Sequence, residues 1–133
     1  MSSYRELCED LLSLDSVLSA TVLRMDGAIL YSDHKGQFEP LLSRSDAEAA
    51  VFRAAIRMGT RKEFMDKLGG IKYAFTAYGK VNQYTIPLDS EVKTLLFISE
   101  GISNHHAGNL EGQLDASPGI LRIFDILKKH GIR

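Results

Sequence analysis

The segment Val92 to Ser99 constrains the fold more than any other part of the sequence, because Leu95, Leu96, Phe97 and Ile98 follow one another within it. Successive side chains of a strand point to opposite faces of a sheet, so a strand of this composition is apolar on both faces. Such a strand needs cover on two sides. We therefore expect Val92 to Ser99 to be the central strand of a sheet that has helices on both faces.

Four other segments have the composition of strands, and short turns join them in pairs. They are Val17 to Arg24, Ala28 to Ser32, Ile71 to Tyr78 and Val81 to Leu88. Asp26-Gly27 separates the first two segments and Gly79-Lys80 separates the last two, and both pairs suit a tight hairpin turn. The sequence thus predicts one hairpin near its start and a three-stranded meander that ends in Val92 to Ser99.

Apolar residues at helical spacing predict a helix near each end of the sequence and one in its middle. The first helix follows Ser3, which forms a capping-box pair with Glu6. The second opens at the similar pair Ser45 and Glu48 and runs to about Met58, where a glycine follows.

A short helical turn is expected over Lys62 to Leu68, and the last helix is expected to start at Ser117-Pro118 and to stop at Gly131. The connection Glu100 to Ser117 has few apolar residues, so the free energy gained by burial does not offset the entropy of ordering it. We expect this connection to be mobile.

These elements predict an α/β protein, a three-layer α/β/α sandwich around a roughly five-stranded antiparallel sheet, in the order α-β-β-α-β-β-β-α. The 133 residues are 44% hydrophobic and 25% charged, which is the composition of one ordinary globular domain. We therefore expect residues 1–133 to form a single domain.

The net charge of −1 does not supply the large positive field that binding to nucleic acid or to an anionic membrane needs. No apolar run approaches the length that spans a membrane, and the first residues include Glu6, Glu9 and Asp10 where a signal peptide would be basic. We expect no nucleic-acid partner, no membrane span and a cytoplasmic location. Cys8 is the only cysteine, so it forms no intramolecular disulfide and is expected to fill the core.

Strong motifs for catalysis, cofactor binding or metal binding are absent from the sequence. His105-His106 and His34 are the visible metal-ligand candidates, but no HxxxH or CxxC spacing supports them. Asp33-His34 lacks the nucleophile motif that a general base would serve, and Gly69-Gly70 precedes a strand, whereas a phosphate loop precedes a helix. We expect no catalytic residue, no cofactor and no metal site.

The element order resembles the roadblock/dynein light chain family, within the wider profilin-like α/β/α architecture. The likeness is most specific in the first hairpin, where Val17-Leu18-Ser19-Ala20-Thr21-Val22 runs into Asp26-Gly27-Ala28-Ile29-Leu30-Tyr31-Ser32. A narrower likeness, to small archaeal proteins of this architecture, lies in Phe64 to Tyr73 and in Tyr84 to Asp89.

The resemblance implies a non-enzymatic module, since roadblock-like proteins are typically non-catalytic dimerising platforms, and many act in complexes that regulate small GTPases. The sequence also departs from the family pattern. It lacks a glycine at the entry to the first strand, adds a helical turn after Gly59, and has the long connection Glu100 to Ser117. These departures bear on GTPase partnership more than on the fold.

In the roadblock-like order, Ile71 to Tyr78 is an edge strand that carries Lys72 as its only charged residue. An uncovered edge of this kind invites pairing with another chain, and pairing with a second copy would satisfy it. The small residues of the second helix would let two helices approach across the same axis. The expected homodimer interface consists of Tyr73, Phe75 and Thr76 from the strand and Ala47, Ala50 and Ala54 from the helix. The alternative is that Lys62 to Leu68 covers the edge within one chain.

Two further expectations concern ligands and partners. Arg53, Arg57 and Arg61 step down the outer side of the second helix, where they could dock a carboxylate-rich partner protein or a phosphate. The alternative function is a small-molecule sensor with a PAS-like or profilin-like pocket between sheet and helix. Its polar groups would be the hydroxyls of Tyr31, Tyr73, Tyr78 and Tyr84.

Overall fold

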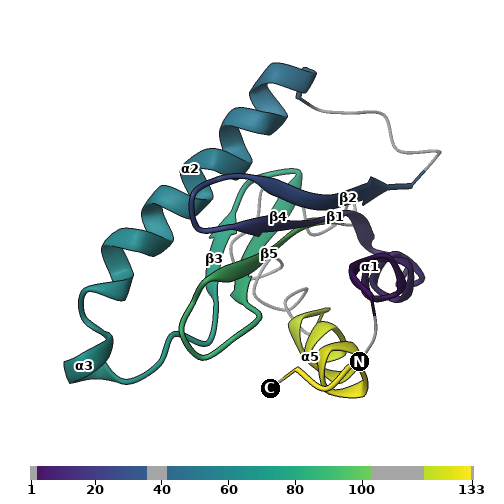
Figure 1. Cartoon of the computed structure of the whole chain (residues 1–133). Helices are drawn as coiled ribbons and strands as arrows, with labels where there is room; N and C mark the ends of the chain where they lie inside the picture. Colours follow the sequence, from purple (N-terminus) through teal and green to yellow (C-terminus); the bar gives the residue numbers. More distant parts are fainter. Residues whose placement is uncertain (1–2, 36–41, 103–118, 133) are drawn as a thin grey trace.

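A five-stranded antiparallel sheet lies between helices in the computed structural model, which describes residues 3–35, 42–102 and 119–132 (Figure 1). The elements are α1 (Tyr4–Leu12), β1 (Val17–Arg24), β2 (Ile29–His34), α2 (Arg44–Lys62), α3 (Met65–Leu68), β3 (Ala74–Ala77), β4 (Val81–Pro87), β5 (Thr94–Gly101) and α5 (Gly119–Lys129). The strands lie in the order β2-β1-β5-β4-β3. Helix α2 covers one face of the sheet, and α1 and α5 cover the other, so the three-layer sandwich and its element order are confirmed.

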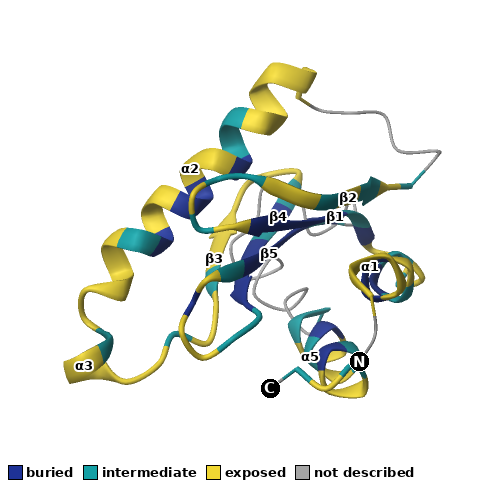
Figure 2. Cartoon of the chain, viewed as in Figure 1, coloured by how far each residue is buried: buried dark blue, intermediate teal, exposed yellow. Residues whose placement is uncertain are grey.

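The central position of β5 is confirmed, since β5 pairs with β1 on one side and with β4 on the other. Leu96 and Ile98 are fully buried on the face that α1 and α5 cover, while Leu95 and Phe97 are buried on the α2 face. Figure 2 shows the buried residues along the inner strands and on the sides of the helices that face them. The four consecutive apolar residues therefore supply both halves of the core.

Each face of the sheet has its own core. On the first face, Leu11 of α1 and Ile123 of α5 pack with residues of β1, β4 and β5. Cys8 belongs to this cluster and is fully buried, and burial raises the pKa of its thiol to about 12. On the second face, Val51 and Met58 of α2 pack with residues of β1 and β5.

A carboxylate of α1 contacts two basic side chains at the end of α5. His130 Nε2 lies 2.6 Å from Asp10 Oδ2, and Lys129 Nζ lies 3.5 Å from the same oxygen. The hydrogen bond from His130, with a smaller contribution from the charge of Lys129, holds the pKa of Asp10 below its ordinary value. The acidic first helix thus complements the basic end of the last one.

The contact between Asp10 and His130 predicts that part of the free energy of unfolding is lost at acidic pH. Folding lowers the pKa of Asp10. The contribution of Asp10 to the free energy of unfolding is therefore complete above its unfolded-state pKa, about 3.9, and is lost as the pH falls through its lower pKa in the folded protein. Asp10 is 39% exposed, so we expect Asp10→Asn to lower the free energy of unfolding at neutral pH by about 1 kcal/mol or less. Urea denaturation at neutral and acidic pH measures the difference. Asp125→Asn, at an exposed position of α5, is the control, and equal losses in both variants would contradict the prediction.

The start of β5 differs from the prediction, because Val92 lies in a turn. The carboxylate of Asp89 accepts hydrogen bonds from the backbone N–H groups of Lys93 and Thr94, at 3.0 and 2.9 Å. Val92 has a φ of 57°, which no strand allows, while its side chain is buried in the core beneath α2. The strand therefore begins at Thr94 and extends to Gly101.

The bounds of α2 were also predicted incorrectly at both ends. Its N-cap is Ser43, whose hydroxyl accepts a hydrogen bond from Asp46 N at 3.2 Å, so the pair Ser45 and Glu48 lies inside the helix. The helix continues through Gly59 to Lys62, since a single glycine costs a helix only about 1 kcal/mol. By contrast, the predicted capping pair of α1 is confirmed, because Ser3 Oγ accepts from Glu6 N at 3.1 Å.

The end of β5 buries a carboxylate that the sequence analysis assigned to a mobile connection. Glu100 is 2% exposed, and its oxygens accept hydrogen bonds from Tyr84 OH at 2.9 Å and from Ser16 Oγ at 3.1 Å. Burial, and then the charge of Glu100, raise the pKa of Tyr84. A Cβ atom at Gly119 would collide with Glu100 Oε2, so the first residue of α5 approaches this carboxylate closely. The prediction of mobility was wrong for Glu100, and residues 103–118 lie outside the described residues.

Candidate functional site

The outer edge of β3 is an open row of backbone groups, since β3 pairs only with β4 among the described residues. Tyr78 N donates to Val81 O at 2.9 Å, and hydrogen-bonded pairs alternate along an antiparallel ladder. Thr76 therefore exchanges hydrogen bonds with Gln83 of β4, while the N–H and C=O groups of Phe75 and Ala77 point to the open edge. This strand is shorter than the predicted Ile71 to Tyr78, because regular pairing with β4 covers only Ala74–Ala77.

Aromatic side chains surround this edge. Tyr73 is 43% exposed and meets the ring of Phe124 of α5 edge-on at 5.7 Å, and Phe75 is 36% exposed and lies 5.1 Å from the ring of Tyr84. Tyr78, at the turn into β4, is 54% exposed. The short helix α3 lies at the far end of α2 in Figure 1, and its Met65 packs against the core beneath α2. No backbone hydrogen bond joins α3 to β3 among the described residues, so α3 leaves the backbone groups of this edge unpaired.

The small residues predicted for the interface occupy three different environments on α2. Ala54 is 2% exposed and packs on the sheet of its own chain, so it is not available to a second copy. Ala50 is half-buried and Ala47 is exposed. The prediction treated the three as one stripe, whereas the helix turns Ala54 toward Phe97 and the core.

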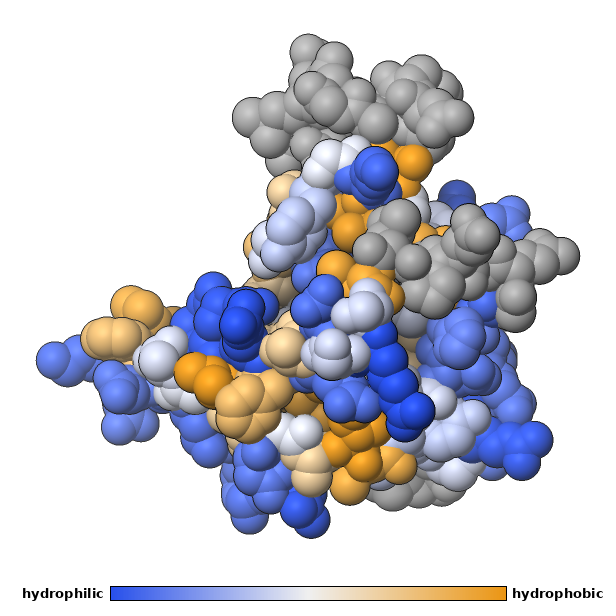
Figure 3. Space-filling view, turned by 90° about the horizontal axis from the view of Figure 1, so that it is seen from above, coloured by the Kyte–Doolittle hydropathy of each residue, from blue (hydrophilic) through white to orange (hydrophobic). Residues whose placement is uncertain are grey.

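Large apolar residues are exposed on another side of α2. Phe52 and Ile56 are 51% and 52% exposed, and the ring of Phe52 lies over the turn between β1 and β2. A Cβ atom at Gly27, which has a φ of 92°, would come within 2.5 Å of Phe52 Cδ1, so only glycine suits this turn. Figure 3 shows apolar surface interrupting the hydrophilic surface in the view from above. The sequence analysis missed these residues because it assigned no apolar residue of α2 to its outer side.

The three arginines predicted to bind a partner are brought together on α2. Arg53, Arg57 and Arg61 are exposed and follow one another at intervals of four residues, so they form a single row. None of the three forms an ion pair within the part of the chain that the structure describes. This arginine row is therefore a local positive surface on a protein of nearly neutral charge.

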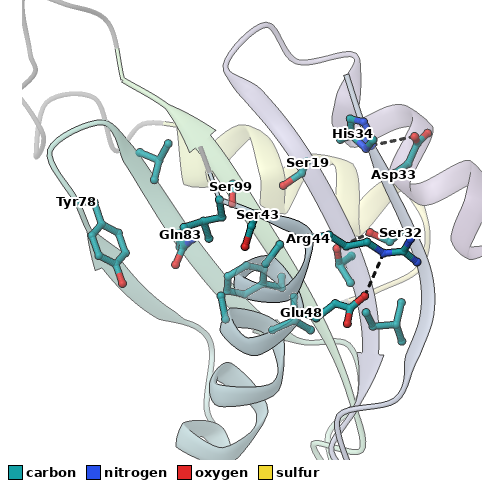
Figure 4. Close-up of a pocket in the computed structure, with 18 of the residues that line it drawn as sticks. Ser19, Ser32, Asp33, His34, Ser43, Arg44, Glu48, Tyr78, Gln83 and Ser99 are labelled. Atoms are coloured by element: carbon teal, nitrogen blue, oxygen red, sulfur yellow. Dashed lines mark hydrogen bonds and ion pairs between the residues drawn. The ribbon is translucent and has the colours of Figure 1, made fainter. Parts of the chain in front are cut away.

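A groove of about 960 Å³ lies beneath the first half of α2, between the helix and the sheet. Its floor comes from β1, β2, β4 and β5, its roof from α2, and one end from the turn between β3 and β4. Figure 4 shows Ser19, Ser99 and Gln83 next to one another on three neighbouring strands, with Tyr78 at the outer end. Carbon atoms make up most of the lining, which includes Ala47, Ala50, Val51, Val81 and Phe97.

The tyrosines predicted for a sensor pocket are not brought together. Tyr84 is buried on the opposite face of the sheet, beside Glu100, and Tyr31 packs against the core on that face. Tyr73 packs on Phe124, and only Tyr78 of the four lines the groove. Small polar side chains of the strands take the place that the sequence analysis gave to tyrosine hydroxyls.

The described residues offer neither a metal-ligand cluster nor a helix that could cross a membrane. No three of their His, Cys, Asp and Glu side chains lie together as a metal site would require, and His105-His106 lies outside those residues. His34 lies at the end of β2, where its backbone N–H donates to the Asp33 carboxylate at 2.8 Å. The helices of residues 3–35, 42–102 and 119–132 are all too short or too polar to cross a membrane.

The fold is that of Roadblock/LC7 domains. A Roadblock/LC7 domain from Streptomyces avermitilis has a TM-score of 0.65 and 15% identity, over 96% of this chain and 94% of that one. The gliding protein MglB from Thermus thermophilus has a TM-score of 0.60 and 11% identity, over 97% and 95%. A further MglB structure, described as having a tetrameric arrangement, has a TM-score of 0.60 and 12% identity, over 97% and 94%.

Sequence comparisons add no closer relationship. No family model matches the chain, and no curated protein does. The fold predicted from the roadblock resemblance is confirmed, while the narrower likeness to archaeal proteins stays a prediction.

Proposed function

We propose that this chain is a non-enzymatic interaction module that forms a homodimer through β3 and presents the outer side of α2 to a partner protein. The observation that carries the proposal is the open edge of β3, where the backbone groups of Phe75 and Ala77 have no partner strand among the described residues. Unpaired strand edges readily add another strand, and a twofold pairing of two β3 strands would satisfy these groups and limit the assembly to two copies.

The two edges of the sheet differ in a way that favours β3. The β2 edge is interrupted by a bulge opposite Val22 and Leu23, and it ends in Asp33, His34 and Lys35. Bulges and charges of this kind are the usual protection against edge pairing. The four residues of β3 carry no charge, and exposed aromatic side chains flank them. A second copy is the partner that matches this edge by symmetry.

Helix α2 can contribute to the same interface. Phe52 lies against the β1–β2 turn, and Ala50 lies roughly 200° around the helix from it, on the side nearer to β4 and β3. Ala47 and Ala50 would let two α2 helices approach closely beside the paired strands. The expected interface is therefore Tyr73, Phe75, Ala77, Ala47 and Ala50, with Ala54 left in the core of each chain.

The arginine row defines the chemistry of the partner. The three guanidinium groups form no ion pair with described residues, and arginine binds carboxylates through two hydrogen bonds, so a partner surface rich in Asp and Glu is favoured. The roadblock resemblance implies a small GTPase as one partner of this kind. The tetrameric arrangement described for an MglB structure also supports a fold that assembles with further chains.

Sedimentation equilibrium from low to high micromolar concentration tests the dimer. We expect the weight-average mass to rise from that of one 14.8 kDa chain toward twice that value. A mass of one chain at every concentration would rule out the homodimer.

The partner surface is tested by replacing Arg53, Arg57 and Arg61 together with Gln. We expect proteins captured by the wild-type chain from a lysate of its source organism to bind the variant at least about tenfold more weakly, because three charge-assisted contacts are lost. Dimer mass should not change.

The control for this variant replaces three exposed cations away from the row, Lys67, Arg122 and Lys128, with Gln. It makes the same change in net charge. Equal loss of binding in both variants would show a non-specific charge effect and would contradict the proposed surface.

A further inference from the structure

We propose that the groove beneath the first half of α2 binds a small amphipathic organic anion, a molecule with an apolar body, a hydrogen-bonding side and one negatively charged group. All of the lining residues come from one protomer, so a single chain can form the site, although Ala47 and Ala50 also belong to the proposed dimer interface. Four observations carry it: a floor whose polar side chains have no protein partner among the described residues, an apolar roof, a lysine at the rim that forms no ion pair with those residues, and a volume that suits such a molecule.

The floor has hydrogen-bonding groups that the protein does not use. Ser19 is the register partner of Ser99, and Ser99 is the register partner of Gln83, so the three side chains form one row across β1, β5 and β4. All three are half-buried and line the groove, and none of their side chains hydrogen-bonds to another described residue. Neighbouring strands are about 4.8 Å apart, so the row spans about 10 Å.

A polar floor is unusual at this place in the fold. Under the second half of α2, the same face of the sheet carries Leu23 and Leu95, which are fully buried. The polar atoms of Ser19, Ser99 and Gln83 are not among the buried atoms without a partner, so water can reach them in the open groove. A ligand that displaces this water must supply hydrogen bonds in its place, because losing hydration without gaining a partner costs free energy. A bound molecule that pairs with Ser19, Ser99 and Gln83 would provide those hydrogen bonds.

The roof of the groove is apolar and leaves space above the floor. Ala47 and Ala50 are small, so they leave space between the helix and the sheet, and Val51 and Phe97 close the inner end of the groove. Burial of the apolar body of a ligand there would stabilise the complex by roughly 25 cal/mol for each Å² of apolar surface removed from water. The volume of about 960 Å³ lies at the upper end of the range for small-molecule sites, about 300–1,000 Å³.

The charges at the rim favour an anion. Arg44 pairs with Glu48 at 3.3 Å, so these two charges offset each other. The side chain of Asp33 belongs to the opposite face of the sheet, as that of its register partner Ala20 does, and its charge acts there on Cys8 of α1. Lys80, in the turn between β3 and β4, forms no ion pair with the described residues. We therefore place the negatively charged group of the ligand at Lys80 and its body under the α2 roof.

Binding of 1-anilinonaphthalene-8-sulfonate, an aromatic sulfonate with these features, tests the inference. We expect a fluorescence titration of the native protein to saturate at one probe per chain with a dissociation constant in the micromolar range. Binding should shift the backbone amide signals of Ser19, Gln83 and Ser99 in nuclear magnetic resonance spectra. Many weak sites per chain, or no saturation, would overturn the proposal.

Two variants locate the probe. Lys80→Gln removes the proposed contact with the sulfonate, and Ser99→Leu fills the floor, and we expect each to raise the dissociation constant at least about tenfold. Lys128→Gln, at an exposed position of α5, is the control for the charge and should bind as the wild type does.

Lys80 is exposed, so its variant is expected to fold even if Ser99→Leu does not. Unchanged binding by Lys80→Gln, or an equal loss in Lys128→Gln, would place the probe outside the groove and overturn the proposal. The mass of each variant is measured in parallel, so that loss of the ligand site and loss of the dimer are distinguished.

Discussion

Leu96→Ala is expected to lower the free energy of unfolding by about 2–5 kcal/mol. Leu96 is fully buried at the centre of β5, where it lies between Val22 of β1 and Ile86 of β4. On the same face, α1 and α5 contribute Leu11 and Ile123 to the cluster around it. The sheet backbone is paired on both sides of Leu96, so it cannot collapse into the space that the missing side chain would leave.

This loss is a large fraction of the free energy of unfolding of a small domain, which is about 5–15 kcal/mol in total. Urea denaturation followed by circular dichroism, at one protein concentration, measures it. Leu121→Ala is the matched control, since it makes the same change at a leucine of α5 that is 66% exposed. A cost below about 1 kcal/mol for Leu96→Ala would show that β5 is not the buried centre of the fold.

Ala77→Pro is expected to raise the dissociation constant of the proposed dimer by about 100-fold or more. The N–H of Ala77 points to the open edge of β3, and proline removes this donor while leaving the hydrogen bonds to β4 in place. Because the two copies are related by a twofold axis, the substitution removes this donor from both of them, and two intermolecular hydrogen bonds are lost. Two hydrogen bonds at about 1.4 kcal/mol each correspond to about 100-fold in the dissociation constant.

Sedimentation equilibrium measures this change, and Ala77→Ser is the control because it keeps the N–H at the same position. Thr76 is not a suitable site for the proline, since its N–H faces Gln83 of β4 and its loss would break the sheet within one chain. If Ala77→Pro kept its native circular dichroism spectrum and still dimerised as the wild type does, the interface would lie elsewhere.

Local signals were enough to predict much of the fold. The apolar run Leu95 to Ile98 located the central strand, Asp26-Gly27 located the first hairpin, and Ser3 located the start of α1. Each of these depends on neighbouring residues, so the sequence shows it directly. The cap of α2 was ambiguous because Ser43 and Ser45 are both suitable residues, and the backbone selects Ser43.

The candidate sites could be predicted only in part, because they depend on register. The floor of the groove joins Ser19, Gln83 and Ser99, which are far apart in the sequence and become neighbours only when β1, β5 and β4 pair as they do. The burial of Glu100 likewise follows from its position beside Tyr84 and Asn82 on β4. A shift of one residue would turn each of these side chains to the other face.

The register between β3 and β4 also determines which backbone groups of β3 point to the open edge. Composition was enough to mark Ile71 to Tyr78 as an unprotected strand, but the choice between Thr76 and its neighbours required the hydrogen bond from Tyr78 to Val81. That bond fixes which amides face β4 and which face outward.

Amide hydrogen exchange of β3 at several protein concentrations tests the central claim most directly, because it observes the proposed contact itself. The account predicts that exchange at Phe75 and Ala77 slows by at least about tenfold as the concentration rises from low to high micromolar, since a second β3 strand would accept their hydrogen bonds. Thr76 is an internal reference, because its amide is bonded to β4 in the monomer and in the dimer. Fast exchange at Phe75 and Ala77 at every concentration, beside a protected Thr76, would contradict the account.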